Sequence, residues 1–270
     1  MRINTNLNAM IATNQMSKNT ALAGSSMEKL STGLRITKAG DDAAGLAVSE
    51  KMRAQIRGME QAERNVQDGI SMVQTAEGAL EEAGNIAQRM RELGVQAGND
   101  TLSAEDRTKV KEELKQLQDE MKNISEETKF NGKQLLNTAG TFTIQAGANS
   151  EIRTVSTANL ASIANNLSLT STNISNASEA QSFVKKVDVA LESINAARSE
   201  LGAMQNRLEY TANNLTTSTE NLTAAESRIR DVDVAKEMVT LSKLNILNQA
   251  SQAMVSQAKQ QPESVSQLLR

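Results

Sequence analysis

Adjacent carboxylates are the first candidates for chemistry in this sequence. The pairs are Asp41-Asp42, Glu81-Glu82, Glu112-Glu113 and Glu126-Glu127. Acid–base catalysis by two carboxylates requires both groups to flank one bond. Neighbouring residues on a helix point in different directions, so these pairs fit solvated helix faces and helix caps better than a catalytic centre.

Composition removes most other reactive groups. The chain of 270 residues has no cysteine and no histidine. Disulfides, thiolate metal ligands, the commonest general base and the commonest nitrogen ligand are therefore excluded. No HExxH, GxSxG or P-loop pattern occurs. We expect no catalytic site, no metal and no cofactor, and an enzyme is the least favoured of the functions considered.

Charge and hydropathy argue against two classes of partner. The formal net charge is −3 with both signs interleaved, which does not favour nucleic acid. The basic stretch from Arg35 to Lys38 lacks aromatic neighbours and lies beside Asp41 and Asp42. No apolar run approaches the roughly 20 residues that span a bilayer. The first residues, Met1 to Gln15, do not resemble a cleavable signal peptide.

Long helices are predicted to carry these residues. Three phenylalanines, one tyrosine and a single proline suit thin seams between helices. A ladder with alternating spacings of four and three predicts a helix of about 182–232. At about 1.5 Å per residue the ladder is roughly 60 Å long, which favours a structural or assembling protein. Its rungs are Val187, Leu191, Ile194, Arg198, Leu201, Gln205, Leu208, Ala212, Leu215, Thr219, Leu222, Glu226 and Ile229.

Two further ladders predict two more helices. The first starts at Met52 and gives a helix of about 44–98, which ends at the C-cap signal Gly98-Asn99. Ser103 and Asp106 then form a capping-box pattern before the second ladder, at residues 110–124. The fold class is therefore mainly α: a long antiparallel helical rod or coiled-coil bundle.

A short central region has a different pattern. Phe142 and Ile144 alternate with polar residues, and Ile152 and Val155 follow after a glycine-containing turn, which predicts a small β-hairpin. Residues 161–181 are rich in Ser, Thr and Asn, so we predict a surface linker there.

Polar residues on the long ladders predict how the two long helices pair. If the terminal segments lie together, facing residue numbers total roughly 278 in an antiparallel coiled coil. We expect contacts of Glu77 with Arg198 and of Arg53 with Glu226, which would fix the register more than add stability. The alternative is that these side chains extend into solvent.

The two chain ends carry weaker apolar stripes among many Asn, Gln, Ser and Ala residues. Such stripes offer too little apolar area to offset the entropy of ordering the chain. We expect both ends to be mobile in the monomer and to fold only against neighbours.

Several motifs, in order, resemble bacterial flagellin. The resemblance covers about residues 1–135 and 185–270. The matching motifs begin at Met1 (MRINTN), Leu30 (LSTGLRI), Ala39 (AGDDAAGL), Asp68 (DGIS), Gln74 (QTAEGAL), Phe130 (FNG), Asn221 (NLTAAESRIRDVD) and Gln260 (QQP, continuing to LLR).

The resemblance implies a domain organisation and a route out of the cell. A terminal coiled-coil core, residues 1–42 with 233–270, would join a helical rod at 43–232 that includes the small β and linker region 137–181. The family is secreted through the flagellar type III apparatus, is held by an export chaperone, and polymerises beneath a filament cap beyond the hook-junction proteins. The implied self-assembly residues are Ile3, Leu7, Ile11, Leu244, Leu247, Met254, Leu268 and Leu269.

Many members of the family are also sensed by a host Toll-like receptor through the rod. The matching positions here are Arg89, Leu93 and Glu113. The alternative is a solvated face that packs on the next subunit, and both can hold.

We therefore predict a structural subunit that self-assembles into the bacterial flagellar filament. A hook–filament junction adaptor shares the terminal pattern and is the alternative.

Overall fold

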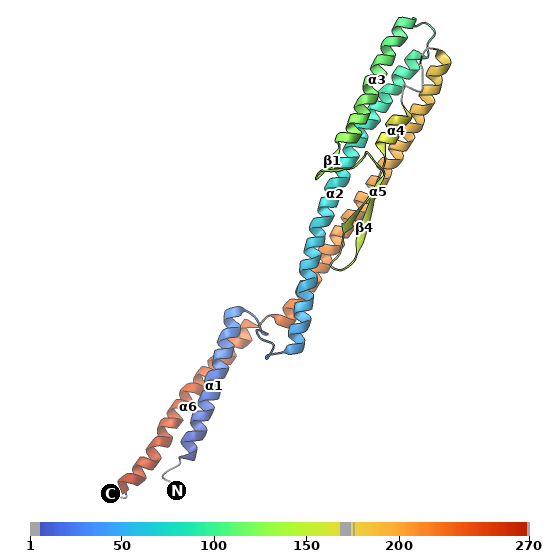
Figure 1. Cartoon of the computed structure of the whole chain (residues 1–270). Helices are drawn as coiled ribbons and strands as arrows, with labels where there is room; N and C mark the ends of the chain where they lie inside the picture. Colours follow the sequence, from blue (N-terminus) through green and yellow to red (C-terminus); the bar gives the residue numbers. More distant parts are fainter. Residues whose placement is uncertain (1–5, 168–173, 175, 269–270) are drawn as a thin grey trace. The chain divides into compact units, whose positions relative to one another are not determined.

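The computed structural model describes residues 6–167, 174 and 176–268 (Figure 1). The predicted mainly α fold with a small antiparallel β region is confirmed. The elements are α1 (Leu7–Thr32), α2 (Ala43–Ala97), α3 (Ala104–Glu127), β1 (Lys129–Phe130), β2 (Lys133–Gln134), β3 (Gly140–Gln145), β4 (Ile152–Thr157), α4 (Leu160–Asn166), α5 (Ala177–Arg230) and α6 (Val234–Leu268).

The chain divides into two compact units. One comprises the residues up to Ala54 together with those from Asn221 onward, and the other is the segment Gln55–Glu220. The division falls inside α2 and α5. The predicted domain boundaries lie elsewhere: one before the start of α2 and one before the start of α6. That domain organisation remains a prediction.

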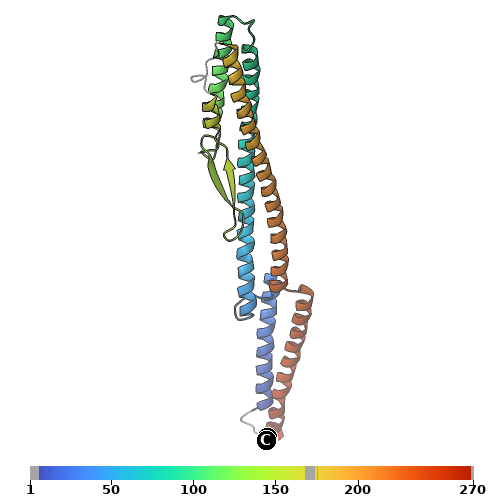
Figure 2. The ribbon, with the colours of Figure 1, turned by 90° about the vertical axis from the view of Figure 1, so that its right-hand side faces the viewer.

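The segment Gln55–Glu220 is built on α2 and α5, which lie side by side with α3 alongside (Figures 1 and 2). α2 contributes glycines to this seam: a Cβ added at Gly84 would lie 3.8 Å from Ile194, and one at Gly94 would lie 2.9 Å from Val184. α5 contributes larger residues, such as Phe183 and Leu208, which are fully buried. Glycines on one helix let the large side chains of the other approach its backbone, which gives a thin and dense core.

α3 begins where the sequence predicts, at the Ser103–Asp106 pattern. Ser103 caps it: its hydroxyl accepts a hydrogen bond from the Asp106 N–H at 3.2 Å and donates one to the Asp106 carboxylate at 2.7 Å. The hydroxyl's hydrogen bond lowers the pKa of Asp106. Past the end of α3, Asn131 and Gly132 have φ of 49° and 77° and join β1 to β2. Both positions of such a two-residue hairpin turn need positive φ, which Asn and Gly tolerate.

The predicted central hairpin is confirmed as β3 and β4. The strands are antiparallel, with Phe142 opposite Val155. The hairpin rests on α2 at two glycines. A Cβ added at Gly58 would lie 2.9 Å from the Cβ of Ala148, and one at Gly69 would overlap Ile144. Because Gly58 and Gly69 have no side chains, the hairpin can pack directly against the backbone of α2.

The linker predicted for residues 161–181 is partly wrong. α4 occupies Leu160–Asn166, and α5 already begins at Ala177. Leu160, Ala164 and Leu167 are buried, and α4 contacts α3. Spacings of four and three place these residues on one helical stripe, whose burial outweighs the polar composition around it. Residues 168–173 and 175, also part of that prediction, lie outside the described residues.

In the other unit, α1 and α6 lie side by side. The residues that follow α1 form backbone hydrogen bonds with the residues that precede α6. Leu34 and Asp231 form an isolated β-bridge. The Arg35 N–H donates to the Arg230 carbonyl at 2.7 Å, and the Val232 N–H donates to the Gly33 carbonyl at 3.0 Å. Gly33 ends α1 in a left-handed conformation, with φ of 72°, the usual residue for that position.

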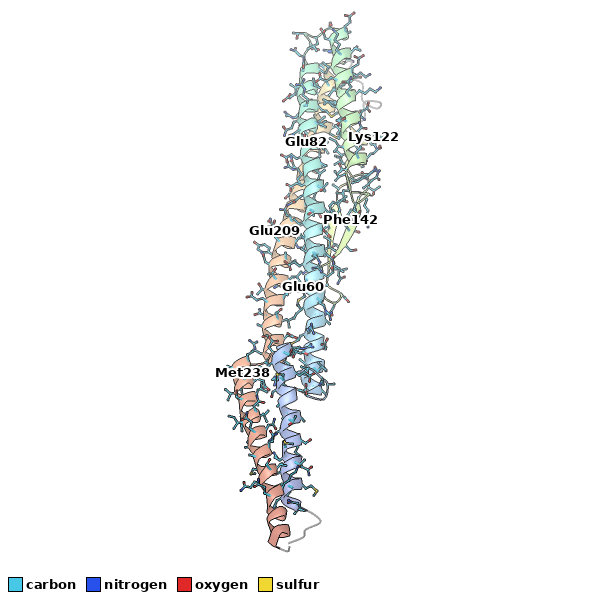
Figure 3. The ribbon with its side chains drawn as sticks, turned by 90° about the vertical axis from the view of Figure 1, so that its left-hand side faces the viewer. Glu60, Glu82, Lys122, Phe142, Glu209 and Met238 are labelled. Atoms are coloured by element: carbon cyan, nitrogen blue, oxygen red, sulfur yellow. The ribbon has the colours of Figure 1, made fainter. Side chains whose placement is uncertain are left out.

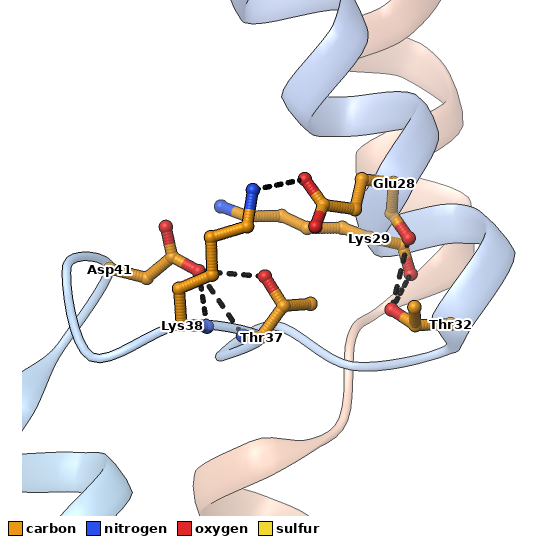
Figure 4. A network of polar contacts seen from close by, with 6 residues as sticks. All are labelled: Glu28, Lys29, Thr32, Thr37, Lys38 and Asp41. Carbon is orange, nitrogen blue, oxygen red and sulfur yellow. Dashed lines mark hydrogen bonds and ion pairs between the residues drawn. The ribbon is translucent and has the colours of Figure 1, made fainter.

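A polar network holds the turn between α1 and α2 (Figure 4). The Asp41 carboxylate accepts hydrogen bonds from the Thr37 hydroxyl at 2.9 Å and from the N–H groups of Thr37 and Lys38, both at 3.1 Å. The Thr37 hydroxyl bond is the main reason that the pKa of Asp41 is lowered. Lys38 donates to Glu28 at 2.8 Å, which raises the pKa of Lys38.

Gly94→Ala and Gly78→Ala are expected to change stability in opposite directions. A Cβ at Gly94 would lie 2.9 Å from Val184 and 3.2 Å from Phe183, whereas one at Gly78 meets nothing within 4 Å. Alanine gains about 0.5–1 kcal/mol over glycine inside a helix, but overpacking costs about 1–3 kcal/mol. Thermal unfolding should show a net loss for Gly94→Ala and a gain for Gly78→Ala. Equal gains for both would contradict the close seam.

Asp41→Asn should destabilise the unit that contains α1 in a pH-dependent way. A carboxyl whose pKa is lowered on folding adds stability above its unfolded pKa, here 3.8, and loses it as the pH falls through the folded value. The difference in thermal midpoint between the parent and Asp41→Asn should thus be greatest near neutral pH and shrink below pH 3.8. A difference that grows in acid would contradict the network in Figure 4.

Candidate assembly interface

The contact between α1 and α6 is polar for a pair of helices. Asn6 donates to the Ala258 carbonyl at 2.6 Å, and Asn19 and Ser26 are buried on α1. Leu244 is the one buried large apolar residue of the two helices among residues 7–32 and 234–260. The pair therefore holds together with little apolar burial of its own.

Most large apolar side chains of these helices are exposed instead. Met238 on α6, labelled in Figure 3, is 52% exposed. Soluble monomers rarely expose so many large apolar side chains on one pair of helices, and such exposure marks a surface that another molecule covers. The terminal apolar surface is defined here as Leu7, Met10, Ile11, Leu22, Met27, Val234, Met238, Val239, Ile246, Leu247 and Met254, which are 39–70% exposed.

A groove of about 460 Å³ runs between the two helices within this surface. Ile11 and Ala12 of α1 line one side, and Met254 and Ala258 of α6 line the other. The groove brings together predicted assembly residues from opposite ends of the sequence.

The predicted self-assembly residues therefore divide into two groups. Leu7, Ile11, Leu247 and Met254 belong to the terminal apolar surface, whereas Leu244 is buried between the helices. Leu268 is described only as the last residue of α6. Ile3 and Leu269 lie outside the described residues. The predicted self-assembly residues leave out seven members of the terminal apolar surface: Met10, Leu22, Met27, Val234, Met238, Val239 and Ile246.

A constant register relates α2 and α5 in the segment Gln55–Glu220. In each facing polar pair the two residue numbers add up to 279, close to the roughly 278 that the coiled-coil pattern predicts. The pairs are Glu63–Thr216 at 3.3 Å, Glu81–Arg198 at 3.8 Å and Arg91–Asp188 at 2.7 Å.

The predicted partner of Arg198 needs a correction. Arg198 forms its ion pair with Glu81, which lies one helical turn after Glu77 on α2. The register of the two helices therefore places Glu81, and not Glu77, opposite Arg198. By contrast, Arg53 Nε lies 4.0 Å from Glu226 Oε1, as the predicted pairing requires, and the Glu226 side chain is only 16% exposed. That these pairs set the register remains a prediction.

The predicted receptor surface also divides. Arg89 donates to Glu113 from Nη2 at 2.9 Å and to Glu92 from Nη1 at 3.1 Å, so Arg89 and Glu113 form an accessible charged cluster between α2 and α3. The Glu113 hydrogen bond is the main cause of the raised pKa of Arg89. Leu93 is 2% exposed and packs in the core. Among the three predicted receptor residues, Leu93 is therefore the inaccessible one, and its role as a receptor contact remains a prediction.

Within the described residues, no group of three or more acidic, cysteine or histidine residues has a metal-binding arrangement. None of the helices in that part of the chain has the length and hydropathy that a membrane-spanning helix requires.

The fold and these surfaces define a class of protein: a helical structural subunit whose helices α1 and α6 pair and leave most of their large apolar side chains exposed. The family model for the bacterial flagellin N-terminal helical region matches residues 3–141, and that for the C-terminal helical region matches residues 184–269. The chain therefore belongs to the bacterial flagellin family. It is a subunit of the bacterial flagellar filament, which serves motility.

Relatives of similar length support this assignment. A flagellin of Halalkalibacterium halodurans is 53% identical over 272 residues, and one of Bacillus subtilis is 48% identical over 311 residues. Both alignments cover 100% of this chain and 100% of the relative, so the chain is a short form of flagellin.

Two solved structures share the fold. The crystal structure of Bacillus cereus flagellin is 34% identical with a TM-score of 0.52, and the match covers 60% of this chain and 94% of that one. A putative flagellar hook-associated protein from Vibrio parahaemolyticus has a TM-score of 0.60 over 71% of this chain and 100% of its own. Its identity of 12% shows a common fold alone.

Double-mutant cycles should separate the observed from the predicted partner of Arg198. We expect a coupling of about 0.2–1 kcal/mol between Arg198→Ala and Glu81→Ala, the usual range for exposed ion pairs. Arg198→Ala and Glu77→Ala should be additive. The free energy of unfolding in urea is the measurement, and a larger coupling to Glu77 would restore the register first predicted.

Proposed function

We propose that this filament subunit assembles through the terminal apolar surface of α1 and α6, and that its role is structural and not enzymatic. The observation that carries the proposal is the inverted pattern of this helix pair. Asn19 and Ser26 are buried, while residues such as Ile246 and Val239 are 65% and 70% exposed. Helices that fold for themselves bury their apolar stripe and expose their polar one.

Assembly would supply the burial that the isolated pair lacks. Burying a Leu, Ile, Val or Met side chain completely contributes about 1.5–3 kcal/mol. The terminal apolar surface offers eleven such residues, whereas Leu244 is the one large apolar side chain that the helix pair buries among residues 7–32 and 234–260. Ordering of α1 and α6 is thus coupled to covering them, as in other segments that fold on binding.

A second copy is the occupant that fits a filament. A head-to-tail contact between different surfaces of identical subunits builds an open helix when the rotation does not close. The groove beside Ile11 and Met254 is open to a side chain from a neighbouring copy. Every copy carries both the groove and the exposed apolar side chains, so growth can continue.

The apolar surface also bears on the route to the filament. Before assembly α6 exposes Val239, Ile246 and Met254, which a partner must cover to prevent aggregation. An export chaperone serves this purpose, and the chain is secreted through the flagellar type III apparatus to polymerise beneath the cap and beyond the hook-junction proteins. On the rod, Arg89 and Glu113 are the accessible residues for a Toll-like receptor in the free subunit.

Leu247→Asp combined with Met254→Asp should abolish polymerisation onto short filament seeds. Two carboxylates in a surface that becomes buried would each lose hydration without a partner, at a cost of several kcal/mol. Electron microscopy of seeded reactions measures filament length, and far-UV circular dichroism should show that the rod helices persist.

Gln249→Asp combined with Gln252→Asp is the matched control. It adds the same charge to the same helix at positions that are already polar and exposed. The control should still elongate seeds. Filaments of normal length from the Leu247/Met254 variant would refute the assembly surface, and failure of the parent chain to elongate any seed would instead favour the hook–filament junction adaptor.

A further inference from the structure

We propose that Asn131 is a site of spontaneous deamidation, in which the backbone nitrogen of Gly132 displaces the side-chain amide through a cyclic imide. This modification site is independent of the assembly surface.

Sequence and exposure single out this residue. Asn131-Gly132 is the one Asn-Gly dipeptide among the 270 residues. Glycine has no Cβ to crowd an attack by its own nitrogen, and it leaves the backbone free to rotate. Both residues are exposed, and the Asn131 side chain makes no hydrogen bond in the described part of the chain. Neither its leaving group nor its electrophilic carbon is held or covered.

The reaction is balanced without any redox partner. The Gly132 nitrogen, after losing its proton to hydroxide, attacks Cγ of Asn131. The new N–Cγ bond closes a five-membered ring, the Cγ–Nδ2 bond breaks, and ammonia leaves with a proton from water. A water molecule then opens the ring at either carbonyl and yields aspartate or isoaspartate.

The hairpin around Asn131 gates this step. With φ of 49°, Asn131 is the first residue of a two-residue turn, and the paired strands on either side restrict the rotation that ring closure needs about its Cα–C and Cα–Cβ bonds. The ladder that resists this rotation has two residue pairs, Lys129 with Gln134 and Phe130 with Lys133. One backbone hydrogen bond, from the Leu135 N–H to the Thr128 carbonyl at 3.1 Å, closes its base. Two-stranded hairpins of this size are marginal, so local opening admits the reaction while the helices stay folded.

Competing sites are better protected. Asn149-Ser150 lies in the loop of the β3–β4 hairpin, which has six residue pairs, and the Asn149 carbonyl accepts a 2.7 Å hydrogen bond from Gln145. Asn19 is 4% exposed inside α1. Asp68-Gly69 could form the same imide by loss of water, but it lies within α2, where the helix holds the backbone.

The product would alter the surface around the turn. Phe130, Asn131 and Lys133 line one side of a groove of about 390 Å³, with Asp68 and Phe142 among its other walls. Deamidation adds a carboxylate next to Lys133. Isoaspartate also adds a carbon to the main chain, which a two-residue turn cannot accommodate while Phe130 stays opposite Lys133.

Peptide mapping by mass spectrometry after incubation of the full chain in mildly alkaline buffer tests the proposal. In the folded protein the Asn131 peptide should gain the mass of an amide-to-acid change before the Asn149 peptide or any other. The same incubation in urea should speed the change at Asn131 several-fold, since the hairpin no longer gates it. Earlier modification of another asparagine in the folded chain would overturn the proposal.

Gly132→Ala tests the nucleophile. Alanine is strained at the Gly132 φ of 77°, so this variant is compared with the parent in urea, where the fold does not matter. The rate at Asn131 should fall several-fold because the added methyl crowds the attacking nitrogen. An unchanged rate in urea would overturn the proposed route.

Discussion

Close packing of α2 against α5 is the contact on which the segment Gln55–Glu220 depends. α2 offers Gly84 and Gly94 at the seam, and α5 fills the space with Ile194 and Phe183. This combination fixes how far apart the helices lie and which turns meet. The ion pairs follow that register and do little to stabilise it, because exposed pairs contribute about 0–1 kcal/mol each.

The helix pair α1–α6 follows the opposite rule. Its seam contains Asn6, Asn19 and Ser26, and its large apolar residues face outward. The two parts of the chain thus use the same kind of element with different distributions of apolar surface. In the segment Gln55–Glu220 the apolar stripes of the helices are buried within the molecule, whereas on α1 and α6 most large apolar side chains remain exposed. Function follows from that difference more than from any reactive group.

Much of the fold could be predicted because helix periodicity is a local property. The ladders located the three longest rod helices, and the Ser103–Asp106 pattern located the start of α3. The spacing of rungs shows which stripe of a helix is buried but not which turn of the partner it meets, so Arg198 was assigned one turn away from Glu81. α4 was missed because only Leu160, Ala164 and Leu167 carry its signal within a polar segment. Leu93 was assigned to a surface through resemblance, and burial depends on the helices packed around it, which a motif does not specify.

The exposed stripe on the terminal helices was predictable in part, for the same reason. Leu7, Ile11, Leu247 and Met254 follow a simple stripe, whereas Met10, Met238, Val239 and Ile246 widen the exposed surface beyond it. A single stripe suffices to pair two helices, since each helix then has one neighbour. A surface wider than one stripe requires more than one neighbour to cover it. The width of the apolar surface on α1 and α6 is therefore itself an argument for a polymer, in which each helix pair is surrounded by copies of itself, over a simple dimer.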